Sequence, residues 1–129
     1  MYKAVVLVGL VASFLAACNP GTGQGASQAV ETYLQALVAR DQNKMIAASC
    51  ASWESQAKVE YDSFAAVKLN LDHLQCQVSG QDDPFTLVTC TGSIIANYGA
   101  EDLKIDVAGR TYQAVQEGGE WRMCGYYGK

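Results

Sequence analysis

The sequence predicts an α+β fold in which three N-terminal helices pack on one face of a curved, four-stranded antiparallel sheet. Three observations predict it. Apolar residues recur at helical spacing in the first half of the chain that follows the N-terminal segment. In the second half they alternate with polar residues, as in half-buried strands. Short segments rich in Gly, Pro, Asn and Asp separate the alternating stretches, which favours antiparallel hairpins.

The first 18 residues have the features of an export signal. Lys3 precedes an apolar run of 12 residues from Ala4 to Leu15, which is too short to cross a hydrocarbon core. The run ends in Leu15-Ala16-Ala17-Cys18, which resembles the lipobox of bacterial lipoproteins. The resemblance implies cleavage before Cys18 and attachment of lipid to its thiol. The alternative is an ordinary secretory signal with a chance cysteine.

The expected processing divides the chain into three parts. Residues 1–17 form the signal peptide, residues 18–26 hold the lipidated cysteine and a flexible tether, and residues 27–126 form one folded domain. The lipid on Cys18 would hold the domain at a membrane of the cell envelope, on the extracytoplasmic side. Asn19 rather than Asp follows the cysteine. By the usual sorting rule this permits an outer membrane if the cell has one, and otherwise the outer face of the cell membrane.

The charge of the mature chain argues against some partners. The full chain has 9 basic and 13 acidic residues, and cleavage removes Lys3, so 8 basic residues remain and the formal charge is −5. An acidic domain without a run of basic residues is a poor candidate for binding nucleic acid. We therefore expect no nucleic-acid partner, and we interpret the charge as that of a solvated surface.

Four cysteines remain after Cys18 is assigned to lipid. They are expected to form disulfides, because an exported chain meets an oxidising compartment. Cys76 and Cys90 lie in successive predicted strands joined by a turn, which favours a cross-strand pair and leaves Cys50 to pair with Cys124. A zinc site is the alternative, but the chain has no CxxC motif and a single histidine. No metal site is predicted.

Three helices are predicted in the first half of the domain. Ser27, Asp41 and Ser52 are each placed to cap one, because their side chains can accept hydrogen bonds from the free backbone N–H groups of a first turn. The first helix carries the apolar stripe Val30, Tyr33, Leu34, Leu37 and Val38. The second is short, with Met45 and Ile46 inward. The third presents Trp53, Ala57, Tyr61, Phe64 and Val67 on one face.

Four strands are predicted to follow. The first two run over Leu71–Ser79 and Phe85–Tyr98, with Cys76 and Cys90 on their apolar faces. The third begins at Leu103 and is interrupted at Gly109, where we expect a bulge. A tight Gly-Gly turn precedes the closing strand, Trp121–Cys124.

Two short patterns suggest a family. The first helix reads Ala29-Val30-Glu31-Thr32-Tyr33-Leu34-Gln35-Ala36-Leu37, and the chain ends in Gly119-Glu120-Trp121-Arg122-Met123-Cys124. With the strands between them, these patterns resemble the nuclear transport factor 2-like superfamily, the cystatin-like or SnoaL-like α+β cone. The resemblance implies a conical pocket between helices and sheet, and a homodimer formed through the open sheet face. Some such proteins are isomerases or dehydratases, and others only bind, so the fold alone does not select a function.

The residues expected to line such a pocket are aromatic: Tyr33, Trp53, Tyr61, Tyr98, Tyr112 and Trp121. The alternative is that these side chains are simply core. His73 is the one histidine, but its strand parity places it opposite Leu74 and Cys76, facing water. Asp72 beside it should point to the other face, so the two form no catalytic dyad. No catalytic residue and no cofactor is predicted.

Two functions remain open from the sequence. The first is a lipid-anchored, extracytoplasmic binding or protein-interaction domain, which would take a small apolar ligand or a protein partner. The second is a cone-fold isomerase or hydrolase acting on a small apolar molecule. The second requires a titratable side chain with a perturbed pKa inside a cavity, whereas a filled interior favours protein interaction.

Overall fold

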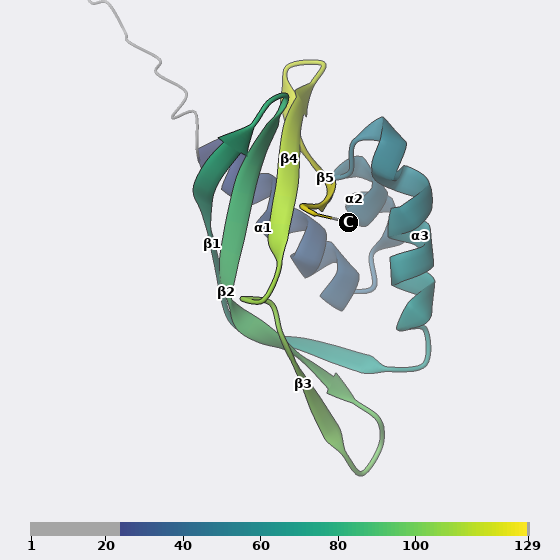
Figure 1. The fold of residues 1–129 in the computed structure, drawn as a ribbon. Helices are drawn as coiled ribbons and strands as arrows, with labels where there is room; N and C mark the ends of the chain where they lie inside the picture. The colour runs from purple at the N-terminus through teal and green to yellow at the C-terminus, as the bar shows by residue number, and fades with distance from the viewer. Residues whose placement is uncertain (1–23, 129) are drawn as a thin grey trace, which may run out of the picture.

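A computed structural model describes residues 24–128 of the chain (Figure 1). Its fold is α+β, as predicted, but the sheet has five strands. The elements are α1 (Gln24–Val38), α2 (Gln42–Ala47), the 3-10 turn η1 (Ala51–Trp53), α3 (Glu54–Ser63), β1 (Lys68–Asp82), β2 (Phe85–Asn97), β3 (Asp102–Asp106), β4 (Thr111–Glu117) and β5 (Glu120–Tyr126). The expected signal peptide, the lipidation site at Cys18 and most of the expected tether lie outside the described residues.

The helix boundaries differ from prediction at two of the three caps. Helix α1 already includes Gln24, and the Ser27 hydroxyl donates a hydrogen bond to the Gln24 carbonyl inside it instead of capping it. Ala26 and Ser27 in its first turn are buried, so packing against the core accompanies the earlier start. Asp41 caps α2 as predicted, because its carboxylate accepts from the Lys44 N–H at 3.0 Å. Ser52 lies within η1, and no side chain caps α3.

The sheet has the order β1-β2-β4-β5, and β3 pairs with β2 beside β4. The prediction of four strands was wrong because the expected third strand is divided into β3 and β4, which pair with different halves of β2. Between them the Asp106 carboxylate accepts from the Ala108 N–H at 2.8 Å, and the Val107 side chain turns into the core. Opposite the break, Gly92 of β2 has φ +98°, and a Cβ there would lie 2.5 Å from backbone oxygens of β1.

Both disulfides join the pairs expected from the sequence. Cys76 of β1 is directly opposite Cys90 of β2, and the two are bonded, with their Cα atoms 4.0 Å apart. The second bridge joins Cys50, just before η1, to Cys124 of β5. Two bonded pairs indicate an oxidising, extracytoplasmic compartment.

Helix α1 packs against the inner face of the sheet, while α2 and α3 lie to the side of β5 (Figure 1). The apolar stripe of α1 packs against the inward-facing residues of β2, β4 and β5, and side chains fill the core between them. The largest fully buried members are Tyr33, Tyr112, Leu34, Leu37, Met45, Met123, Val30 and Val88. Among the described residues, no helix is both long and apolar enough to cross a bilayer.

Candidate functional site

The six aromatic residues predicted to line one pocket occupy four different places. Tyr33, Trp53 and Tyr112 meet in a cluster between α1, α3 and the sheet. Trp121 lines a surface groove on the other side of β5. The remaining two lie elsewhere: Tyr61 stacks against Arg40 at 3.9 Å, and Tyr98 is 55% exposed at a hairpin tip. The prediction of a common lining was therefore wrong.

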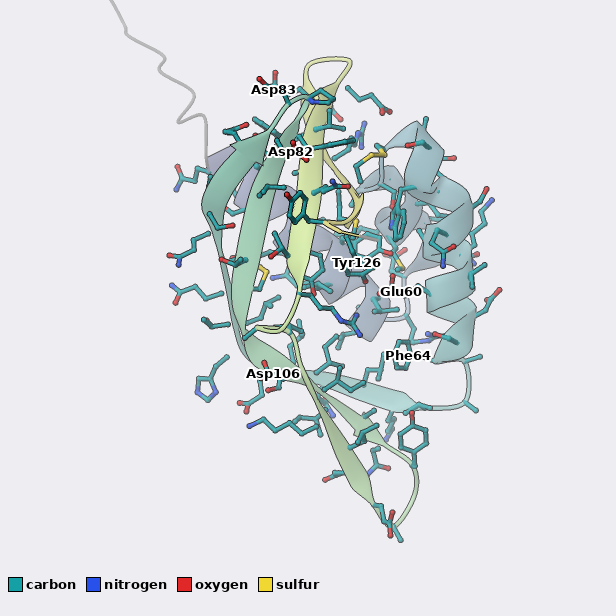
Figure 2. All side chains as sticks on the ribbon, in the orientation of Figure 1. Glu60, Phe64, Asp82, Asp83, Asp106 and Tyr126 are labelled. Carbon is teal, nitrogen blue, oxygen red and sulfur yellow. A yellow bond between two sulfur atoms is a disulfide. The ribbon has the colours of Figure 1, made fainter. Side chains whose placement is uncertain are left out.

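The cluster is organised around the carboxylate of Glu60, on α3. Tyr33 of α1 donates its hydroxyl proton to Glu60 Oε2 at 3.0 Å. Tyr126 of β5 donates to Glu60 Oε1 at 2.7 Å, and Figure 2 shows these two side chains together between α3 and the sheet. The Trp53 indole N–H donates to the Tyr33 hydroxyl at 3.2 Å. Both oxygens of the Glu60 carboxylate therefore accept hydrogen bonds from protein donors. These bonds connect α3 to α1 and to β5.

The rings of the cluster pack edge to face and at a tilt. The centroid of Tyr126 lies 5.6 Å from Trp53 and 5.3 Å from Tyr112, within the range of favourable aromatic pairs. Burial raises the pKa of Tyr112 to about 12. Burial first, and then the negative charge of Glu60, raise the pKa values of Tyr33 and Tyr126 further. At neutral pH these hydroxyls stay protonated, so they can donate hydrogen bonds but cannot act as bases.

Tyr112 differs from the other two tyrosines of the cluster. Its hydroxyl is completely buried and has no hydrogen-bond partner among the described residues. A buried polar group without a partner costs free energy. Within the cluster, both carboxylate oxygens of Glu60 therefore have hydrogen-bond partners, whereas the Tyr112 hydroxyl has none among the described residues.

Glu60 and Tyr126 were not among the predicted site residues. Glu60 lies three residues after Ala57 and four before Phe64, on the stripe that was predicted to face inward. A single carboxylate in an apolar helical stripe was therefore the signal available in the sequence. Its partners could not be predicted, because Tyr33 and Tyr126 lie 27 and 66 residues away.

A surface groove of about 420 Å³ lies between the start of α1, α2 and β5. Small residues give it depth: Gly25 and Ala29 on α1, and Ala47 and Ala48 at the end of α2. Trp121 forms one wall. The indole lies so close to Gly25 that a Cβ on that residue would come within 2.2 Å of the ring. Glycine is therefore required at position 25 if the tryptophan is to lie where it does.

Polar side chains occupy the rim of the groove. Arg122 donates to the Ala47 carbonyl and forms an ion pair with Glu120 at 2.6 Å. Lys44 is exposed and lies at the same rim. The groove is therefore lined by two cations and one anion. Arg122 is paired with Glu120, so Lys44 provides the excess positive charge among the charged residues that line the groove. This arrangement suits an apolar or aromatic group that carries a negative charge.

The interpretation of His73 was right about exposure and wrong about its neighbour. Its side chain is 92% exposed, but Nδ1 lies 2.5 Å from Asp72 Oδ1. The alternation of faces fails here because His73 has φ +53° and the pairing of β1 with β2 shifts between Asp72 and Gln75. Such an exposed pair contributes little to stability, and no cavity adjoins it among those the structure describes.

No group of three or more His, Cys, Asp or Glu side chains within residues 24–128 has the arrangement of a metal site. Comparison of the chain with protein-family models, with curated proteins and with solved structures gave no match. The function must therefore be inferred from the chain's own residues.

Proposed function

We propose that the mature chain is a lipid-anchored, extracytoplasmic binding domain, and that the groove between α1, α2 and β5 is its binding site. The observation that carries the proposal is the contact between Gly25 and Trp121, because it keeps an aromatic wall beside an open cavity of about 420 Å³. The ligand is a small molecule or a partner side chain with an apolar or aromatic body. A carboxylate on that ligand would face Lys44 and Arg122.

Anchoring through Cys18 belongs to the same proposal. Leu15-Ala16-Ala17-Cys18 supports it, together with the disulfides, which fit an exported domain. Only five residues lie between Cys18 and Gln24, so the chain between them can span at most about 20 Å. The groove begins at α1 and would therefore lie close to the membrane. The cone shape implied by the superfamily resemblance is also part of the proposal.

The aromatic cluster favours binding over the isomerase or hydrolase alternative. Glu60 is the obvious base in the interior, but both of its oxygens accept hydrogen bonds from tyrosines. Those tyrosines have raised pKa values and keep their protons. A general base needs a free acceptor within reach of a substrate proton, and Glu60 lines none of the four pockets described for residues 24–128.

The groove can be tested by fluorine NMR, because its tryptophan and that of the cluster report separately. The mature chain, labelled with 5-fluorotryptophan in lipid nanodiscs, is titrated with 3-phenylpropionate, an aromatic carboxylate. The Trp121 resonance should shift and that of Trp53 should stay. Gly25→Ala should abolish the shift by displacing the indole, while Gln35→Ala, an exposed change on the same helix, should leave it unchanged. Equal titration of wild type and Gly25→Ala would refute the site.

The anchor needs a separate measurement. Mass spectrometry of the protein from its native host should show an N-terminus at Cys18 that carries acyl chains. Cys18→Ser should release the protein from the membrane fraction. An uncut and unacylated N-terminus would rule out the anchor and leave the groove result unaffected.

A further inference from the structure

We infer that β3 is a self-association edge, through which two copies of this chain pair antiparallel and form one continuous sheet. Figure 1 shows β3 projecting from the rest of the sheet, away from α2 and from the start of α1. This inference is independent of the groove, which lies at the other end of the molecule. It also differs from a dimer through the open sheet face, because the contact is made by backbone groups at a strand edge.

The other sheet edges are occupied or irregular. Along β5, Met123 exchanges backbone hydrogen bonds with the segment Ala48–Cys50, at 2.8 Å each. Along β1, the Cys76 N–H donates to Glu31 of α1, and two register shifts interrupt the strand. Such features block the addition of another strand. Within the described residues, β3 pairs with β2 alone, so its outer edge is open.

The hydrogen bonds of the β2–β3 hairpin show which residues face that edge. Tyr98 N–H donates to the Glu101 carbonyl, and Val107 N–H donates to the Gly92 carbonyl. Because bonded and non-bonded pairs alternate in an antiparallel ladder, Leu103 and Ile105 also direct their backbone groups toward β2. Asp102, Lys104 and Asp106 therefore direct theirs outward. The outward backbone N–H and C=O groups of these three residues can form hydrogen bonds with a further strand.

The side chains of β3 are complementary to a second copy in one register. Leu103 is 51% exposed and lies in line with Ala96 and Leu69 on the apolar face of the arm. If Leu103 lies opposite Leu103 of the second copy, then Asp102 lies opposite the second copy's Lys104, and Lys104 opposite its Asp102. Both exposed leucines are then covered, and two pairs of opposite charge form across the ladder.

The symmetric register centred on Lys104 is disfavoured by charge. Centring the pairing on Lys104 would place Lys104 opposite Lys104 of the second copy and Asp102 opposite its Asp106. Like charges directly opposite each other destabilise a sheet. The charge pattern of β3 therefore excludes the register centred on Lys104. Centring on Ile105 would place Lys104 opposite Asp106 of the second copy. Ile105 is already half-buried, however, whereas Leu103 is 51% exposed, so covering the exposed side chain favours the register centred on Leu103.

Cysteine crosslinking of the full-length chain in membranes tests the register. The four described cysteines outside the signal region are already bonded to one another, so a new thiol reports on its own position. Leu103→Cys should form a reducible dimer on mild oxidation, because facing residues of a non-hydrogen-bonded pair lie about 4.5 Å apart. Lys104→Cys should crosslink several-fold less. Ser79→Cys, exposed on β1, provides the background level. Crosslinking at Leu103→Cys no greater than at Ser79→Cys, or greatest at Lys104→Cys, would overturn the inference.

A charge swap tests the pairing without a new thiol. Lys104→Asp should weaken self-association about tenfold in analytical ultracentrifugation of the detergent-solubilised chain, because both cross-strand pairs become repulsive. The double variant Asp102→Lys/Lys104→Asp should restore it. Thermal unfolding shows whether each variant is folded, since Asp102 also accepts a hydrogen bond from Asn97. Unchanged association in a folded Lys104→Asp chain, or no rescue in a folded double variant, would contradict the proposed register.

Discussion

Two regions on either side of β5 each contain a tryptophan, and they differ in what surrounds it. Trp53 lies in the Glu60 cluster, where its N–H and both carboxylate oxygens have protein partners. Trp121 lies against Gly25 in an open groove lined by alanines. The first region uses its polar atoms to hold α3 in place, whereas the second leaves an aromatic surface accessible. A group of aromatic residues is thus a candidate binding site only where small neighbours leave space beside it.

The bridge between Cys50 and Cys124 connects the two regions, and its removal should have the largest effect. Cys50 precedes Trp53, and Cys124 lies between Trp121 and Tyr126. The bridge closes a loop with a sequence separation of 74, against 14 for Cys76–Cys90. Loop entropy predicts losses of about 4.5 and about 3 kcal/mol for the two Cys→Ala double variants. Urea unfolding measures both. A larger loss at the Cys76–Cys90 bridge would contradict this order.

Glu60→Ala should destabilise the domain by about 3 kcal/mol, because it removes two hydrogen bonds to a charged group and leaves two tyrosine hydroxyls without that acceptor. Asp62→Ala, an exposed change on the same helix, should cost less than about 0.5 kcal/mol. Denaturant unfolding of the two variants gives the difference. If the groove is independent of the cluster, the Trp121 fluorine resonance should not move in Glu60→Ala.

Alkaline pH should act on the cluster. Burial raises the pKa of Tyr112 to about 12, above the value of about 10 for an unfolded chain. The stability that the neutral Tyr112 hydroxyl contributes is complete below about pH 10. It falls by about 1.4 kcal/mol per pH unit as the pH rises from about 10, and it is lost as the pH passes through about 12. Unfolding free energies measured between pH 8 and 11.5 should fall with a shallower slope in Tyr112→Phe. An identical slope in both proteins would exclude Tyr112 as a source.

The smallest predicted effect concerns single hydroxyl groups and has opposite signs at two positions. Tyr33→Phe should cost about 1 kcal/mol, because it removes a donor to Glu60 and an acceptor for Trp53. Tyr112→Phe should be neutral or slightly stabilising, because its buried hydroxyl has no partner among the described residues. Thermal unfolding of the matched pair gives the comparison. Equal destabilisation by the two changes would mean that Tyr112 also has a partner.

Much of the fold follows from local patterns in the sequence. The change from helical to alternating periodicity predicted the α+β class, and Asp41 predicted the start of α2. The Gly-Gly turn is present between Glu117 and Glu120, where both glycines have positive φ. These features are determined over a few residues, by backbone conformation and by which side chains face the core. The facing positions of Cys76 and Cys90 follow from the same alternation, once two strands are joined by a short turn.

The site, in contrast, was decided by contacts between segments distant in sequence. Glu60 acquires its role from Tyr33 and Tyr126, and the groove exists because α1 brings Gly25 against Trp121. The division of the third strand was similarly decided by its pairing with two halves of β2. Periodicity determines which face of an element is buried. Only packing determines which polar atoms meet within a buried face and where space remains, because both depend on the relative positions of whole elements.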